Sequence, residues 1–315
     1  MDVQRGAVMS STDTRLLDDV SLAAQLGLTS IRLDVPWTLA QPRAGGFDGG
    51  VFEHLHTVAE VARACGLDTW FRLLQPEVPH WFDDEGGFTD GRTSGTWWPR
   101  WVELVADRLG DVASGWVPIE APFGMCRRLM PDDPRRHGEV THHVVVAWRD
   151  AWRILRGTVP VATSLDVATE RPMNDSAEAR EASARLDHLR WGLWLRGLAD
   201  GVVRIPGRAD RPLDDLAGAV DVLGLALRRD VEICLHRAAE YGLDRPMAVV
   251  YRPEGSSDGE RAQQITSMWR EVRRAADQLP IDNIAITPFV DLPAMPGIVT
   301  IDREVKDSGH TFASP

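Results

Sequence analysis

The sequence predicts a (β/α)8 barrel that spans residues 1–315 as a single domain. Eight short apolar runs of strand length alternate with amphipathic stretches of helical spacing, an order typical of a parallel sheet whose strands are joined by helices. The chain of 315 residues is long enough for one such barrel. No linker or change in composition divides it, so we expect one domain.

The predicted strands are mostly continuous apolar runs, as expected for strands that are buried on both faces. In chain order they are Val8–Ser10, Ser30–Val35, Asp68–Leu74, Trp116–Glu120, Val159–Asp166, Asp221–Leu227, Met247–Arg252 and Asn283–Pro288. The predicted helices carry apolar residues three and four positions apart, and some end at a glycine. They are Thr14–Leu26, Val51–Cys65, Trp98–Leu109, His142–Leu155, Glu178–Leu198, Val231–Tyr241 and Glu260–Gln278.

Composition and charge narrow the class of protein. A hydrophobic content of 43% and a charged content of 26% are those of a soluble globular protein. The net charge of -12 argues against nucleic acid or an anionic membrane as the main partner. The three cysteines have no metal-binding spacing, and neither a secretion signal nor a membrane span is evident. We therefore expect a cytoplasmic protein with reduced thiols, and the arginine-rich composition indicates a bacterial gene.

The stretch Gly115–Pro122 carries the first candidate for chemistry. It is a buried strand that ends at Glu120, because Pro122 lacks a backbone donor and cannot continue the sheet. Barrel enzymes place their active sites at the carboxyl ends of the strands, so Glu120 is a candidate catalytic group. Other carboxylates at or just after strand ends are Asp34, Glu77, Asp166 and Asp291. For the last three, capping a following turn or helix is the alternative expectation.

With these elements placed, the chain resembles the family 1 glycoside hydrolases, the β-glucosidase family. Segments similar to the motifs of that family follow one another in order: Ile31–Trp37, Leu74–Pro79, Trp116–Glu120, Asp221–Leu225, Pro246–Gly255 and Gly297–Asp302. The resemblance implies a barrel that acts on a glycoside. It also implies that Glu120 is the acid/base, and that Arg32 matches the arginine that orients the nucleophile.

Several departures from the family pattern argue against an ordinary β-glucosidase. Ile119 stands in place of the asparagine that contacts the 2-hydroxyl of the sugar, and Gln75 in place of the sugar-binding histidine. The sixth strand has Ala226 and Leu227 where the family has asparagine and tyrosine, and Thr287 replaces a tryptophan of the eighth strand. We therefore expect a pocket that is poorer in sugar-binding polar groups.

The nucleophile of the family is the largest loss. The run Arg252–Gly255 stands where the family has threonine, glutamate, asparagine and glycine, and alternative alignments place Pro253 or Tyr251 at the nucleophile position. Glu254 is one residue away. Because strand side chains alternate between faces, Glu254 reaches the site only if the strand carries a bulge.

The remaining expectations concern the second carboxyl group and the substrate contacts. Two carboxyl groups stand about 5–5.5 Å apart in retaining glycosidases and about 6.5–9.5 Å apart in inverting ones. Glu120 supplies one, and Glu254 or Asp34 is the candidate for the other. Arg32 is expected to pair with Asp34 or Glu120, either in the site or as a structural ion pair. The candidate substrate contacts are Arg32, Trp37, Gln75, Glu77, Trp81, Asp166, Tyr251, Arg252 and Thr287.

Three functions are compatible with these residues. The first is a glycosidase-like hydrolase acting on a glycoside. The second is a barrel that uses Glu120 as a general acid or base on an apolar, ring-containing small molecule, in a cyclisation, elimination or isomerisation. The third is a non-catalytic barrel that binds a sugar or a protein. The sequence shows no phosphate-binding glycine loop, serine nucleophile elbow or nicotinamide fingerprint, so we expect neither a cofactor nor a metal.

Overall fold

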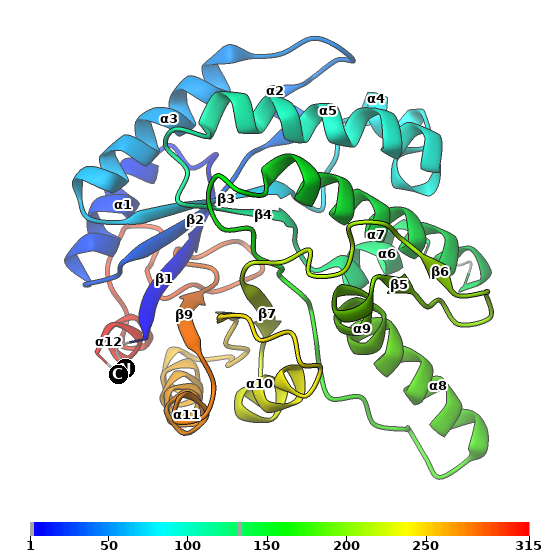
Figure 1. Cartoon of the computed structure of the whole chain (residues 1–315). Helices are drawn as coiled ribbons and strands as arrows, with labels where there is room; N and C mark the ends of the chain where they lie inside the picture. Colours follow the sequence, from blue (N-terminus) through cyan, green and yellow to red (C-terminus); the bar gives the residue numbers. More distant parts are fainter. Residues whose placement is uncertain (1–2, 131–133, 315) are drawn as a thin grey trace.

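The computed structural model describes residues 3–130 and 134–314. Its main sheet is curled and consists of seven parallel strands in the spatial order β4-β3-β2-β1-β9-β8-β7 (Figure 1). These strands are β1 (Gln4–Met9), β2 (Ser30–Asp34), β3 (Asp68–Leu74), β4 (Gly115–Ile119), β7 (Leu223–Leu227), β8 (Met247–Tyr251) and β9 (Ile281–Ile286). Each coincides with or overlaps a predicted strand, and β3 has the predicted bounds.

Residues 161–165 fill the gap between β4 and β7 and complete the barrel. They form three parallel bridges to the two edge strands: Trp116 with Val161, Ala162 with Val222, and Leu165 with Leu225. Backbone hydrogen bonds accompany these bridges, for example from the amide of Ala162 to the carbonyl of Trp116 at 2.8 Å. The segment lies within the predicted fifth strand, so the sheet closes into the (β/α)8 barrel that the sequence predicts.

One side chain takes part in this closure. The hydroxyl of Thr163 accepts a hydrogen bond from the amide of Gly224 at 2.9 Å and donates one to the carbonyl of Gly224 at 3.0 Å. The two backbones approach so closely that a Cβ atom at Gly224 would lie 1.9 Å from the carbonyl oxygen of Thr163. Only glycine fits at this position of β7.

Helices surround the sheet on its outer side (Figure 1). The longer ones are α1 (Leu16–Gln25), α3 (Gly49–Ala64), α5 (Gly91–Leu109), α7 (Pro134–Leu155), α8 (Ala177–Asp187), α9 (Leu193–Asp200), α10 (Val231–Ala239) and α11 (Asp258–Ala276). The single helix predicted over Glu178–Leu198 is divided by a π-helical turn, η2 (His188–Gly192). Short elements that were not predicted are α2 (Trp37–Ala40), α4 (His80–Asp84), η1 (Gly87–Thr89), α6 (Pro122–Leu129), α12 (Asp307–Ala313) and the hairpin of β5 (Val202–Val203) with β6 (Arg211–Pro212).

Side-chain caps explain where several helices begin. The side chains of Asp48 and Asp90 accept hydrogen bonds from backbone amides in the first turns of α3 and α5. At α11 a capping box joins Ser257 and Glu260, so that each side chain accepts from the backbone of the other. These contacts satisfy amides that have no partner within the helix.

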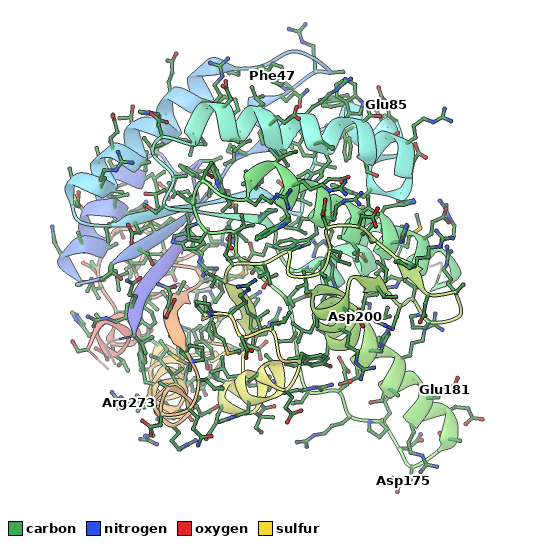
Figure 2. The ribbon with its side chains drawn as sticks, in the orientation of Figure 1. Phe47, Glu85, Asp175, Glu181, Asp200 and Arg273 are labelled. Carbon is green, nitrogen blue, oxygen red and sulfur yellow. The ribbon has the colours of Figure 1, made fainter. Side chains whose placement is uncertain are left out.

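The larger part of the core lies between the strands and the helices, and it includes an aromatic cluster. Trp37 stacks on Trp101, with ring centroids 5.2 Å apart and planes 11° apart, and it also packs against Phe82 and Trp98. Only 1% of Trp37 is exposed. The sticks in Figure 2 show the interior filled with side chains, while charged residues such as Glu181 and Arg273 point outward. None of the helices in the described ranges has the length and hydrophobicity of a membrane span.

Candidate active site

A cavity of about 960 Å³ opens at the carboxyl ends of the strands, and we call it the mouth cavity. Each of the seven labelled strands of the barrel, or the loop directly after it, contributes to its lining. The candidate residues among the lining side chains are Asp34, Arg72, Gln75, Glu77, Glu120, Asp166, Arg252 and Thr287. The cavity therefore lies where the barrel fold predicts an active site.

Arg72 joins the two carboxylates of this cavity. Its Nη2 lies 2.8 Å from Oδ1 of Asp34, and its Nη1 donates to Oε2 of Glu120. Asp34 and Arg72 are paired residues of the neighbouring strands β2 and β3, while Glu120 follows the last residue of β4. Three adjacent strand ends thus converge on one guanidinium group. Its side chain is 11% exposed, compared with 23% for Asp34 and 25% for Glu120.

Arg32 lies deeper in the barrel, two residues before Asp34 on the same strand. It is 3% exposed, and burial lowers its pKa to about 10, although nearby Glu120 favours the charged form. At that pKa the guanidinium remains protonated near neutrality. Its Nη1 has no hydrogen-bond partner within the described part of the chain. The expected ion pair of Arg32 with Asp34 or Glu120 is therefore wrong, because Arg72 binds both carboxylates instead.

The environment of Asp34 makes its protonated form more favourable. Burial raises the pKa of Asp34, and the negative charge of Glu120 acts in the same direction. Arg72 opposes this shift through its charge and its hydrogen bonding, and Gln75 opposes it through a hydrogen bond. Gln75 is itself held by a bond from its Nε2 to the carbonyl of Arg72 at 2.7 Å. Asp34 therefore binds a proton more readily than a carboxyl group in water.

Asp166 holds the start of α6. Its two carboxylate oxygens accept from the amides of Phe123 at 3.0 Å and Gly124 at 2.7 Å. Ala121, with φ of 48°, turns the chain between Glu120 and this helix. Asp166 thus caps a helix that precedes it in the chain, so the alternative expectation of a cap on a following turn or helix is wrong for Asp166. Burial raises the pKa of Asp166, while the bonds from the two amides lower it.

The buried Arg32 and three further predicted substrate contacts lie outside the mouth cavity lining. Tyr251 is 3% exposed, and burial raises its pKa to about 12. Its neighbour Val250 lines the cavity instead, as the alternation of side chains along a strand requires. Trp37 is part of the aromatic cluster, and Trp81 packs edge-on against Trp97 while its Nε1 donates to the carbonyl of Gln41 at 2.9 Å. The expectation that these three line the substrate cavity is wrong, because packing directs them into the core and its rim.

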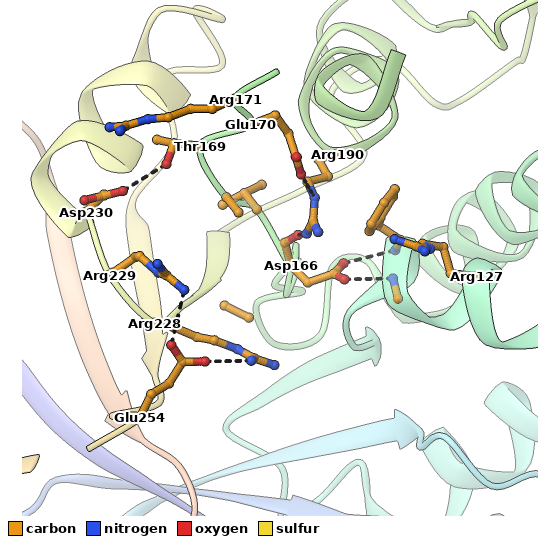
Figure 3. A pocket seen from close by; sticks show the side chains of 15 residues that line it. Arg127, Asp166, Thr169, Glu170, Arg171, Arg190, Arg228, Arg229, Asp230 and Glu254 are labelled. Carbon is orange, nitrogen blue, oxygen red and sulfur yellow. Dashed lines mark hydrogen bonds and ion pairs between the residues drawn. The ribbon is translucent and has the colours of Figure 1, made fainter. Parts of the chain in front are cut away.

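Glu254 lies in a second, adjacent cavity of about 760 Å³, shown in Figure 3. Nitrogen atoms of Arg228 and Arg229 lie 2.8 Å and 3.5 Å from its carboxylate oxygens. The only irregularity in the pairing of β8 with β9 is between Met247 and Ala248, at the other end of the strand. Asp34 and Glu120 therefore share Arg72 as a partner in the mouth cavity. Glu254 pairs with Arg228 and Arg229 in the second cavity instead.

The sequence itself assigns the chain to a family. The model of glycosyl hydrolase family 1 matches residues 2–205, which include Asp34, Arg72 and Glu120. The chain belongs to this family.

Solved structures of family 1 enzymes and their relatives share the fold. The GH1 β-glucosidase from Exiguobacterium antarcticum B7 matches with a TM-score of 0.84 and 16% identity, over 99% of this chain and 96% of that one. The β-glycosidase from Pyrococcus horikoshii matches with 0.82 and 18%, over 94% and 82%. An aphid myrosinase matches with 0.84 and 11%, over 99% and 97%. At these identities the likeness establishes the fold.

One wall of the mouth cavity in this family 1 barrel is mainly apolar, although Arg252 and Thr287 also lie on it. It is formed by Ala226, Leu227, Val250, Phe289, Leu292 and Met295. At the rim, Leu39 is 52% exposed and Leu292 is 39% exposed. The opposite wall carries the charged group of Asp34, Arg72 and Glu120. The cavity is therefore suited to a ligand with one apolar face and one polar face.

Arg72 is the functional candidate that the sequence patterns missed. It stands between the apolar residues Phe71 and Leu73 in the strand Asp68–Leu74, and a buried guanidinium requires a carboxylate partner. That requirement, combined with the expected position of Arg72 near the end of a strand, was the signal that could have identified it. In the described ranges no cluster of three or more histidine, cysteine, aspartate or glutamate side chains is arranged to hold a metal ion.

Proposed function

We propose that this family 1 barrel is a glycosidase-like hydrolase in which Glu120 is the general acid/base and Asp34 is the second carboxyl group. The observation that carries the proposal is the bridge by Arg72, which holds both groups at the mouth of one cavity. Hydrolysis of a glycosidic bond requires two carboxyl groups with different roles on opposite sides of that bond. Membership of the family supports a glycoside as the substrate.

The two carboxyl groups have distinct roles in this proposal. Glu120 donates its proton to the leaving oxygen as the bond to the sugar breaks. Asp34 either attacks the sugar carbon or removes a proton from the attacking water, and its raised pKa makes it a stronger base. Arg72 keeps the two groups aligned and prevents their mutual repulsion in the empty site. Buried Arg32 adds positive charge beneath them.

The substrate is not the one that an ordinary retaining β-glucosidase accepts. Three polar residues that bind sugar hydroxyls in the family are replaced here by Ile119, Ala226 and Leu227. Ala226 and Leu227, both on β7, line the mouth cavity. Polar contacts remain available from Gln75 and Arg252 on the cavity wall. We therefore expect weak discrimination among sugars, because few buried polar groups are present to reject a wrong one.

A second candidate function is acid/base chemistry on an apolar ring compound. The apolar wall that includes Val250 and Leu292 favours it, because such a surface has little use for a sugar hydroxyl. In that reaction Glu120 and Asp34 transfer protons to and from the ring compound, and no glycosidic bond is cut.

The test is hydrolysis of activated aryl β-glycosides, with and without azide, by four proteins: wild type, Glu120→Gln, Asp34→Asn and the control Glu181→Gln. Glu181 is an exposed carboxylate on α8. We expect turnover by the wild type and the control, and a loss of about 10²–10⁴-fold for Glu120→Gln. Azide should restore turnover to Asp34→Asn if Asp34 is the nucleophile.

Each other outcome has a defined meaning. Equal rates for Glu120→Gln and the wild type would exclude Glu120 as the acid/base. Turnover of aryl glycosides that survives Asp34→Asn without azide would remove Asp34 from the mechanism. If no protein turns over any aryl glycoside, with or without azide, the hydrolase proposal fails and ring chemistry becomes the function to test.

A further inference from the structure

We propose that the second cavity binds an anionic group on the leaving part of the substrate, a carboxylate or a phosphate. This inference rests on the proposed function and names the class of substrate for the same site. The cavity, which we call the arginine cavity, contains five arginines: Arg127, Arg171, Arg190, Arg228 and Arg229. Its four carboxylates are Asp166, Glu170, Asp230 and Glu254. A positive balance here contrasts with the net charge of -12 for the whole chain.

The carboxylates of the arginine cavity already have partners. Glu170 binds Nε of Arg190 at 2.5 Å, and Glu254 is shared by Arg228 and Arg229. Asp230 accepts from the hydroxyl of Thr169 at 2.9 Å, and the oxygens of Asp166 are bound by two backbone amides. The acidic groups are thus satisfied within the protein.

Within the part of the chain that the structure describes, two of these arginines lack a carboxylate partner. Arg127 makes only a stacking contact with Phe123, its guanidinium carbon 5.9 Å from the ring centroid, and Arg171 has no ion pair or hydrogen bond within the described residues. Figure 3 shows Arg127 on the α6 side of the cavity and Arg228 and Arg229 on the opposite side. A planar guanidinium with free donors binds carboxylate or phosphate oxygens in a bidentate manner.

The position of the arginine cavity determines which part of the substrate reaches it. The two cavities adjoin, because both are lined by Gly124, Asp166, Ala226 and Arg228. The chain runs from Glu120 through one turn into α6, which carries Gly124 and Arg127. In the proposed mechanism Glu120 protonates the leaving oxygen, so the leaving group lies on the side of Glu120. From there it extends towards the arginines.

The first experiment measures binding by calorimetry of three 1-thio-β-glucosides that are not hydrolysed. Their aryl groups carry a 4-carboxylate, a 4-phosphate or a 4-carboxylic methyl ester. We expect at least one anionic compound to bind about tenfold more tightly than the ester at low salt. The variant Arg127→Gln/Arg171→Gln should lose that advantage and bind the ester unchanged. The control Arg273→Gln, an exposed arginine on α11, should behave as wild type.

Equal binding of all three compounds by the wild type would overturn the inference. Preference for the carboxylate over the phosphate, or the reverse, identifies the anion. Benzoate, phenyl phosphate and methyl benzoate carry no sugar and test the arginine cavity alone. If the two anions bind and the double variant loses them while no glucoside binds, the arginine cavity is an anion site, and its assignment to the leaving group fails together with the hydrolase proposal. If neither anion binds more tightly than methyl benzoate, the inference fails whatever the enzyme hydrolyses.

Discussion

Replacing Arg72 by glutamine should destabilise the protein more than the loss of an ordinary surface ion pair. The change removes the one guanidinium that contacts both Asp34 and Glu120 and leaves two carboxylates side by side. Removing one partner of a fully buried pair costs about 3–5 kcal/mol. Asp34 and Glu120 are 23% and 25% exposed, so water compensates part of the loss. We expect a decrease of about 2–3 kcal/mol in the free energy of unfolding.

Urea unfolding followed by circular dichroism provides the assay, with the midpoint expected to fall while the slope stays constant. Asp34→Asn in the Arg72→Gln background should recover about half of the loss, because one of the two unpaired charges is removed. The control is Arg153→Gln, whose ion pair with Asp215 joins side chains that are 38% and 46% exposed. It should change stability by less than about 1 kcal/mol. An Arg72→Gln protein as stable as the control would refute this account of the site.

Two further predictions concern titration. Burial raises the pKa of Asp34 above its usual value of 3.8, so the protonated group favours the folded state; this contribution is present at low pH and is lost as the pH rises through the folded-state pKa. Asp34→Asn should therefore gain stability relative to wild type between pH 3 and pH 7 in urea unfolding, and a constant difference would contradict the shift. Cys65 is exposed, whereas burial raises the pKa of Cys126 and Cys234 to about 12. A chromogenic disulfide reagent at pH 8 should thus label one thiol in the native protein and three in denaturant, and rapid labelling of a second would disprove this.

The barrel could be predicted from the sequence because its strands are buried on both faces. Continuous apolar runs such as Met247–Tyr251 have few other places in a globular protein, and their alternation with helices leaves one simple topology. Short elements were harder to predict. Helix α6 follows a left-handed residue at Ala121 and is held by Asp166, which is more than forty residues away in the chain, so local patterns did not reveal it.

The sequence predicts where the two carboxylates of the candidate site lie, but it does not predict which arginine binds them. Glu120 and Asp34 were found because both stand at strand ends, and barrel strands bring their carboxyl ends together. The partner of these carboxylates depends on the register between β2 and β3, which pairs Asp34 with Arg72 and leaves Arg32 two pairs deeper. Register is a tertiary property. Tyr251 is a second example. The alternation of side chains along β8 decides whether Tyr251 points into the cavity, and its distance from a motif in the sequence does not.

The hydroxyl of Thr163 adds two side-chain hydrogen bonds to the backbone pairing that closes the barrel. Peptide groups also pair at this junction, for example the amide of Leu165 with the carbonyl of Gly224 at 3.0 Å. Between residues 161–165 and β7, both backbone groups of Gly224 bind one side-chain oxygen. A valine at position 163 would keep the shape and remove both bonds. The barrel would stay closed through its backbone pairing, and the loss would fall on the strand segment that leads to Asp166 and the arginine cavity.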